Sequence, residues 1–114
     1  MKGLIIKEPW INFILNGEKT WEIRGSNTKI RGKIYLIKSG TGMMFGECDL
    51  ADSFPVTFEI FIENKHKHRI PNNSGVFIQY KNPHVWVMQN PVRYPEPKPY
   101  EHKQGAIIWI NIQD

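Results

Sequence analysis

The chain has 114 residues, enough for one domain (residues 1–114) with a single hydrophobic core and too few for two. Hydrophobic residues make up 40% of it and charged residues 23%, a composition that excludes an intrinsically disordered chain. The net charge of +4 is too mild to indicate nucleic-acid binding by itself. The apolar runs are too short for a signal peptide or a membrane span, and the single Cys48 cannot form an internal disulfide. We therefore expect a cytoplasmic protein with no membrane partner.

The first half of the chain predicts strands around one helix. Residues 4–6 form a short apolar strand, and Pro9 suits the first position of a helix whose apolar residues recur at three- and four-residue spacing. The pair Asn16-Gly17 is typical of a helix end. Three further strands are predicted, over residues 20–24, 33–38 and 43–50.

The second half is harder to interpret. Residues 56–63 fit both a strand and a helix, because their apolar side chains alternate and also recur at helical spacing. Residues 84–88 and 105–112 predict two more strands. Between these strands stand Pro91, Pro95, Pro97 and Pro99, which lack the N–H group that a central strand needs, so we expect an extended surface connection. Several short strands and two helices in so small a chain indicate a closed or nearly closed β-barrel.

The most informative segment is residues 17–24, which carries four charged side chains in eight positions. If its second part is an extended strand, Glu22 and Arg24 share one face, while Trp21 and Ile23 point to the other face, toward the core. An edge strand with a solvated polar face would show the same alternation. The spacing alone therefore leaves both interpretations open.

The order Gly-x-Lys-x-x-Glu-x-Arg in this segment resembles the motif of the ASCH domain family. The similarity covers nearly the whole chain, and it includes Lys7-Glu8-Pro9-Trp10, residues 13–16, 32–39 and 44–50, His84-Val85-Trp86, Asn90-Pro91, Pro97 to Tyr100, His102 and Gly105 to Trp109. The resemblance implies an α+β fold, a PUA-like small β-barrel of about five to seven strands with two or three short helices and a cleft beside the first helix. It also implies that residues 56–63 form a helix.

The same resemblance implies an RNA-related role, in which a charged cleft holds a nucleotide, nucleoside or nucleobase. We expect Lys19 and Arg24 to contact phosphate or a base edge and Glu22 to accept a hydrogen bond. We expect Trp10 or Trp86 to stack on the base. The other residues assigned to the cleft from the family layout are Lys38, Ser39 and His84.

A small hydrolase is the first alternative. One branch of the ASCH family hydrolyses the acetyl amide of acetylated cytidine with a lysine, a threonine and a glutamate. Lys19 matches that lysine, but Glu22 stands where the branch has its catalytic threonine. If the protein is an enzyme, we expect Lys19 and Glu22 to be catalytic. The other hydrolytic alternative is a ribonuclease that pairs a lysine with a tyrosine, for which Tyr35, Tyr80 and Tyr100 are available.

A protein-interaction module is the second alternative, because the proline-rich residues 91–99 can dock a partner in extended form. The four histidines, His66, His68, His84 and His102, raise the question of a metal site. One cysteine and scattered histidines do not give the spacing of a zinc site, so we expect no metal and place His66 and His68 in a solvated basic loop. No nucleotide-binding loop or other cofactor motif is present, and we expect no cofactor. The oligomeric state stays open.

Overall fold

The computed structural model describes residues 1–72, 74–75 and 77–113, the side chain of residue 78 excepted. Within these residues, six strands form one mixed sheet in the order β2-β5-β4-β3-β1-β6. The strands are β1 (Lys2–Ile6), β2 (Trp21–Arg24), β3 (Gly32–Lys38), β4 (Met43–Pro55), β5 (His84–Pro99) and β6 (Trp109–Asn111). The described helices are α1 (Trp10–Leu15), α2 (Phe58–Glu63), α3 (Lys65–His68) and the short 3-10 helix Phe77–Gln79.

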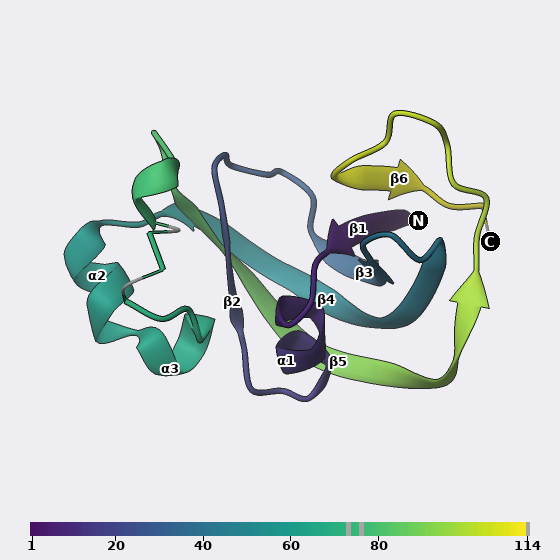
Figure 1. Ribbon diagram of the computed structural model, residues 1–114, viewed down its shortest axis with the longest axis horizontal. Coiled ribbons are helices and arrows are strands. Elements are labelled where there is room, and N and C mark those ends of the chain that lie inside the picture. Colours follow the sequence, from purple (N-terminus) through teal and green to yellow (C-terminus); the bar gives the residue numbers. More distant parts are fainter. Residues whose placement is uncertain (73, 76, 114) are drawn as a thin grey trace.

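The sheet is strongly bent and barrel-like. β1 lies parallel to β3, and every other pair of neighbouring strands is antiparallel. In the described residues β2 and β6 are the two edges of the sheet, so the barrel is not closed by backbone pairing. Figure 1 shows α2 and α3 together at one end of the molecule and both termini at the other end, near β6. The expected α+β fold, a small barrel-like sheet with short helices, is confirmed.

Helix α1 packs across the inside of the bent sheet. Its residues Ile11, Ile14 and Leu15 are buried in the main hydrophobic core together with side chains of β1, β3, β4 and β5. The helix comes close to β4 at Gly46, where an added Cβ would lie 2.5 Å from Leu15 Cδ2 and 2.3 Å from the Val92 carbonyl oxygen. Glycine is therefore required there, because any larger residue would push α1 off the sheet.

Most of the predicted elements are present with shifted ends. The strands expected over residues 4–6, 20–24 and 33–38 correspond to β1, β2 and β3, and the first helix ends before Gly17, whose φ is +79°. The helical alternative for residues 56–63 is confirmed as α2, and the Thr57 hydroxyl caps it by accepting a hydrogen bond from the Ile60 N–H at 3.3 Å. β4 continues beyond residue 50 because residues 52–55 pair with β5.

The proline-rich segment is extended and mostly exposed, as expected, but it is not a connection outside the sheet. All four prolines belong to β5, a single long strand that pairs with β4. Two features explain how the strand accommodates them. β2 pairs with β5 only at residues 84–87, so the later part of β5 has one neighbour, and residues 94–97 fall where the β4–β5 register shifts. Proline is tolerated on such an edge because no N–H is needed on the open side. Conversely, the strand expected over residues 105–112 shortens to β6.

Candidate functional site

The motif strand β2 lies against β5, with Glu22 opposite Trp86 and Arg24 opposite His84. Trp21 and Ile23 are buried in a second hydrophobic cluster, together with residues of α2 and β5. Glu22 and Arg24 both line a pocket on the side of α1. The predicted alternation, with charged side chains toward a cleft and apolar side chains toward the core, is confirmed.

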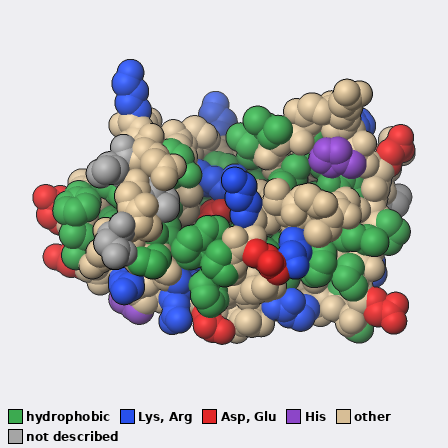
Figure 2. All heavy atoms as spheres, viewed as in Figure 1, with side chains coloured by type: hydrophobic (Ala, Val, Ile, Leu, Met, Phe, Trp, Pro, Cys, Tyr) green, Lys and Arg blue, Asp and Glu red, His purple; other side chains and the backbone are tan. Residues whose placement is uncertain are grey.

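This pocket, the central pocket below, has a volume of about 350 Å³. It is lined by Ile5, Lys7, Trp10, Glu22, Ile23, Arg24, Ser39, Ile70, Gln79, Tyr80 and Ile107. Figure 2 shows this face hollowed near its middle, with an acidic side chain recessed below Lys or Arg side chains. The hollow therefore has an acidic floor, a basic rim and apolar walls.

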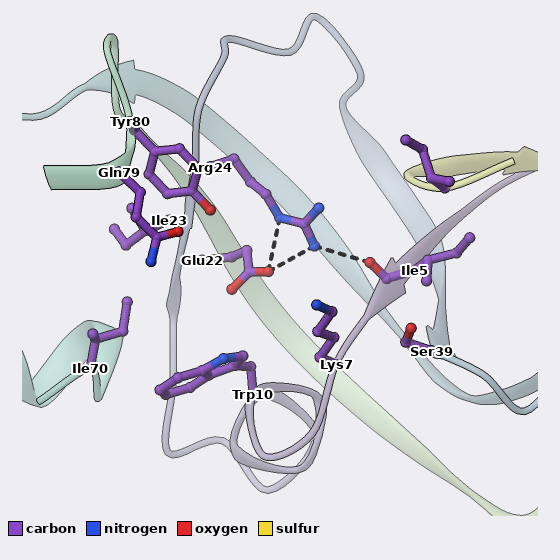
Figure 3. Close-up of a pocket in the computed structure, with 11 residues that line it drawn as sticks. Ile5, Lys7, Trp10, Glu22, Ile23, Arg24, Ser39, Ile70, Gln79 and Tyr80 are labelled. Carbon is purple, nitrogen blue, oxygen red and sulfur yellow. Dashed lines mark hydrogen bonds and ion pairs between the residues drawn. The ribbon is translucent and has the colours of Figure 1, made fainter. Parts of the chain in front are cut away.

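The carboxylate of Glu22 is held in place by Arg24. Glu22 Oε2 accepts a hydrogen bond from Arg24 Nε at 3.0 Å and forms an ion pair with Arg24 Nη2 at 2.8 Å, and the same Nη2 donates to the Ile5 carbonyl oxygen at 3.1 Å. The guanidinium thus bridges β2 and β1, which are not neighbours in the sheet. Figure 3 shows the second carboxylate oxygen, Oε1, turned away from Arg24 and toward the part of the pocket between Trp10 and Gln79. That oxygen is an acceptor in a fixed position.

Lys19 does not lie in the cleft to which the family resemblance assigned it. Its side chain is fully buried, and it is not among the residues that line the central pocket. Lys19 Nζ donates to the His68 carbonyl oxygen at 2.6 Å and lies 3.6 Å from Glu22 Oε1. Burial lowers the pKa of Lys19 from 10.5 to about 8, although the nearby Glu22 carboxylate acts in the opposite direction.

His68 is likewise buried rather than part of a solvated loop. Its ring stacks on Phe61 with centroids 4.0 Å apart. His68 Nδ1 accepts from the Ile70 N–H at 2.9 Å, so the proton is on Nε2, which donates to the Phe61 carbonyl oxygen at 2.7 Å. Burial lowers the pKa of His68 below 6.5. The ring fixes α3 to α2, and the backbone oxygen of the same residue then reaches Lys19.

Three polar residues at the pocket rim were not assigned to the cleft from the sequence. Lys7 follows β1, Gln79 ends the 3-10 helix, and Tyr80 follows it. Figure 3 shows all three side chains directed toward Glu22. Lys7 belongs to the segment Lys7-Glu8-Pro9-Trp10 that resembles the ASCH family, and Tyr80 is one of the tyrosines considered for a ribonuclease. No sequence signal identifies Gln79.

The remaining cleft candidates divide between the pocket and its surroundings. Trp10 and Ser39 line the central pocket. Lys38 is paired with Glu8 and lies outside it. His84 is buried, and its Nδ1 is 2.8 Å from the Asn82 carbonyl oxygen. Trp86 is buried in the main core, on the other side of the Arg24 guanidinium, which lies 5.5 Å from its ring centroid.

Neither a metal cluster nor a membrane helix is found in the parts of the chain that the structure describes. No three or more His, Cys, Asp or Glu side chains there come together as metal ligands would. None of the described helices is both long enough and apolar enough to cross a membrane. The side chains that line the central pocket offer hydrogen bonds, charge and an aromatic surface for stacking.

Comparisons with known proteins agree on the family. A model of the ASCH domain matches residues 4–110. The fold is similar to crystal structures of an ASCH protein from Zymomonas mobilis: one serine-to-alanine variant has a TM-score of 0.75 at 10% identity, covering 98% of this chain and 87% of that one. A tyrosine-to-phenylalanine variant has a TM-score of 0.72 at 10% identity, covering 86% and 74%. No curated protein matches the sequence. Because the family model spans nearly the whole chain, the protein belongs to the ASCH domain family.

Proposed function

We propose that this protein binds RNA or a nucleotide and holds one nucleobase in the central pocket. The observation that carries the proposal is the Glu22 carboxylate, fixed by a hydrogen bond and an ion pair with Arg24 at one end of a pocket that Trp10 also lines. An acceptor whose position is set in advance loses little freedom when a ligand binds, and a neighbouring aromatic ring supplies a surface for stacking. The volume, about 350 Å³, is at the lower end of the range for small-molecule sites.

The chemistry of the pocket favours a base with N–H donors on its edge. Glu22 Oε1 accepts hydrogen bonds only, so it suits an exocyclic amine or a ring N–H group of a base. Lys7 at the rim and Arg24 beside the carboxylate supply positive charge for a phosphate. This combination supports a nucleotide better than an uncharged ligand or an acidic peptide.

Calorimetric titration with the common ribonucleosides, their 5′-monophosphates and acetylated cytidine tests this proposal. A hydrogen bond to a charged group contributes about 1.5–3 kcal/mol, so Glu22→Gln is expected to weaken binding by about tenfold or more. Glu63→Gln, at an exposed position of α2, is the matched control and should bind like the wild type. If no nucleoside or nucleotide binds, or if both variants bind like the wild type, the proposal is wrong.

Hydrolysis of an acylated nucleoside is a second candidate, favoured by one observation. The pKa of Lys19 is lowered to about 8, which increases the neutral form that a nucleophile or base requires. The position of Lys19 opposes this role, because its Nζ is buried and donates to the His68 carbonyl oxygen. Release of acetate from acetylated cytidine by the wild type but not by Lys19→Met would support hydrolysis. The proline-rich segment, offered as a docking segment for a protein partner, is part of β5 and pairs with β4.

A further inference from the structure

A second hollow adjoins the central pocket across two shared residues, Arg24 and Tyr80. This aromatic hollow has a volume of about 520 Å³. Its lining comprises Arg24, Gly25, Ser26, Asn27, Tyr80, Trp86, Ile108 and Trp109. The nucleobase proposed above occupies the central pocket alone, so the aromatic hollow is not used by that proposal.

The aromatic side chains of this hollow are held in fixed positions. Trp109, half-buried, stacks on Trp86 with ring centroids 5.7 Å apart and an interplanar angle of 17°. Trp86 is itself fixed, because its Nε1 donates to the Ser26 carbonyl oxygen at 2.9 Å. Tyr80 lies close over Gly25, where an added Cβ would stand 2.8 Å from the tyrosine Cδ1. Rigid aromatic surfaces that are partly exposed are what a stacking nucleobase requires.

Arg24 forms the wall between the two hollows. Its Nε and Nη2 are engaged by Glu22 and Ile5, whereas Nη1 has no hydrogen bond within the described residues. Figure 3 shows Nη1 directed away from the Glu22 carboxylate. A guanidinium nitrogen with free N–H groups, placed between two base-sized hollows, suits the phosphate that joins two nucleotides.

We propose that the aromatic hollow binds a second nucleobase, so that the ligand is single-stranded RNA rather than a free nucleoside. One base occupies the central pocket, the neighbouring base stacks on Trp109, and the linking phosphate lies at Arg24. This inference rests on the function proposed above and specifies its ligand as a polymer. Ile108, which is 43% exposed and lines the hollow with the stacked tryptophans, gives the hollow an apolar rim that a base can contact.

Calorimetric titrations with the four ribonucleoside 5′-monophosphates and with the four homotrinucleotides test the inference. For the base that binds best, the trinucleotide should bind at least tenfold more tightly than the monophosphate. Trp109→Leu should remove about tenfold of trinucleotide affinity and leave the monophosphate affinity unchanged, whereas Trp109→Phe, which keeps an aromatic ring, should retain most of the trinucleotide affinity. Far-ultraviolet circular dichroism confirms that each variant is folded.

A second pair of variants does not depend on the packing of Trp109. Ile108→Glu places a negative charge at the rim and should weaken trinucleotide binding about tenfold, while Ile62→Glu, at a position of α2 with similar exposure, should not. Equal affinities for monophosphate and trinucleotide, or equal losses of both in Trp109→Leu, would overturn the inference and leave the single-base proposal standing. Absence of binding by both ligand classes would overturn both proposals.

Discussion

The ammonium group of Lys19 has no contact with solvent, and its partners are the His68 carbonyl oxygen at 2.6 Å and Glu22 Oε1 at 3.6 Å. It also lies 5.1 Å from the ring centroid of Trp10. Lys19 therefore joins three elements, α3, β2 and α1, beneath the central pocket. Its structural role is to hold Glu22 from the side opposite Arg24.

We predict that Lys19→Ala lowers the free energy of unfolding by about 1–3 kcal/mol, because it leaves the buried His68 carbonyl oxygen without its donor. The cavity that the substitution opens adds to this loss. Urea unfolding measures the change. Lys29→Ala, at an exposed lysine, should stay within about 0.5 kcal/mol of the wild type. Similar losses in both variants would show that Lys19 has no special structural role.

The lowered pKa of Lys19 predicts a stability that rises with pH. Between about 8 and 10.5 the unfolded chain binds the Lys19 proton more tightly than the folded protein does. The free energy of unfolding therefore rises as pH increases over this range, by up to about 1.4 kcal/mol per pH unit. This gain in stability is lost as pH falls back toward about 8. The difference between wild type and Lys19→Met in urea unfolding should change across this window. A constant difference would mean that the folded-state pKa is not lowered.

The residues of the site differ in how far the sequence could identify them. Alternation correctly predicted that Glu22 and Arg24 share one face, because it depends only on local backbone geometry, and the family resemblance assigned that face to the cleft. The burial of Lys19 depends on the His68 carbonyl oxygen, 49 residues away along the chain, which no local pattern reveals. Trp86, expected to stack on a base, is buried in the main core. The period of a strand shows which residues share a face, but it does not show which face is the core.

At the level of elements, the sequence predicted those that depend on local signals. The end of α1 before Gly17 is an example, because it follows from the chemistry of one or two residues. The extent of β5 was not predictable in the same way. Its prolines are tolerated because β2 is short and the register with β4 shifts, and both are properties of neighbouring strands.

The α2–α3 unit should weaken in acid, because His68 is held neutral. Its pKa lies below 6.5 in the folded protein, so the unfolded chain takes up this proton first as pH falls. The stability that neutral His68 contributes is therefore complete above pH 6.5 and is lost progressively below it. Relative to His68→Phe, which keeps a ring but does not titrate, the wild type should lose stability between about pH 7 and pH 5. Parallel pH profiles in urea unfolding would contradict this.

At the scale of the whole molecule, the side chain of Arg24 bridges the gap between edge strand β2 and β1, which do not pair through their backbones. Arg24 links β2 to β1 through the Ile5 carbonyl oxygen, and the central pocket lies at this junction. The sequence indicated a closed or nearly closed barrel from the number of short strands. It did not indicate which strands remain unpaired, because that depends on the final pairing of β5 with both β2 and β4.

The net charge of +4, with Lys7 and Arg24 at the pocket, predicts that the proposed RNA binding weakens as salt rises. Each phosphate neutralised in a single strand contributes about −0.7 to the slope of log K against log salt. Lys7→Ala should reduce this slope by about that amount, whereas Lys65→Ala, on α3, should leave it unchanged. Fluorescence anisotropy with a labelled homotrinucleotide measures both slopes. An affinity that does not vary with salt would rule out the phosphate contacts.

The claim that a nucleotide binds in the central pocket is tested most directly by nuclear magnetic resonance. Isotope-labelled protein is titrated with each ribonucleoside 5′-monophosphate, and backbone amide, tryptophan indole and arginine Nε signals are followed. We predict that the largest shifts occur at Trp10, Glu22 and Arg24, which surround the pocket. Shifts that are absent with every monophosphate, or that gather instead around Tyr35 and Met44 on another part of the surface, would contradict the account.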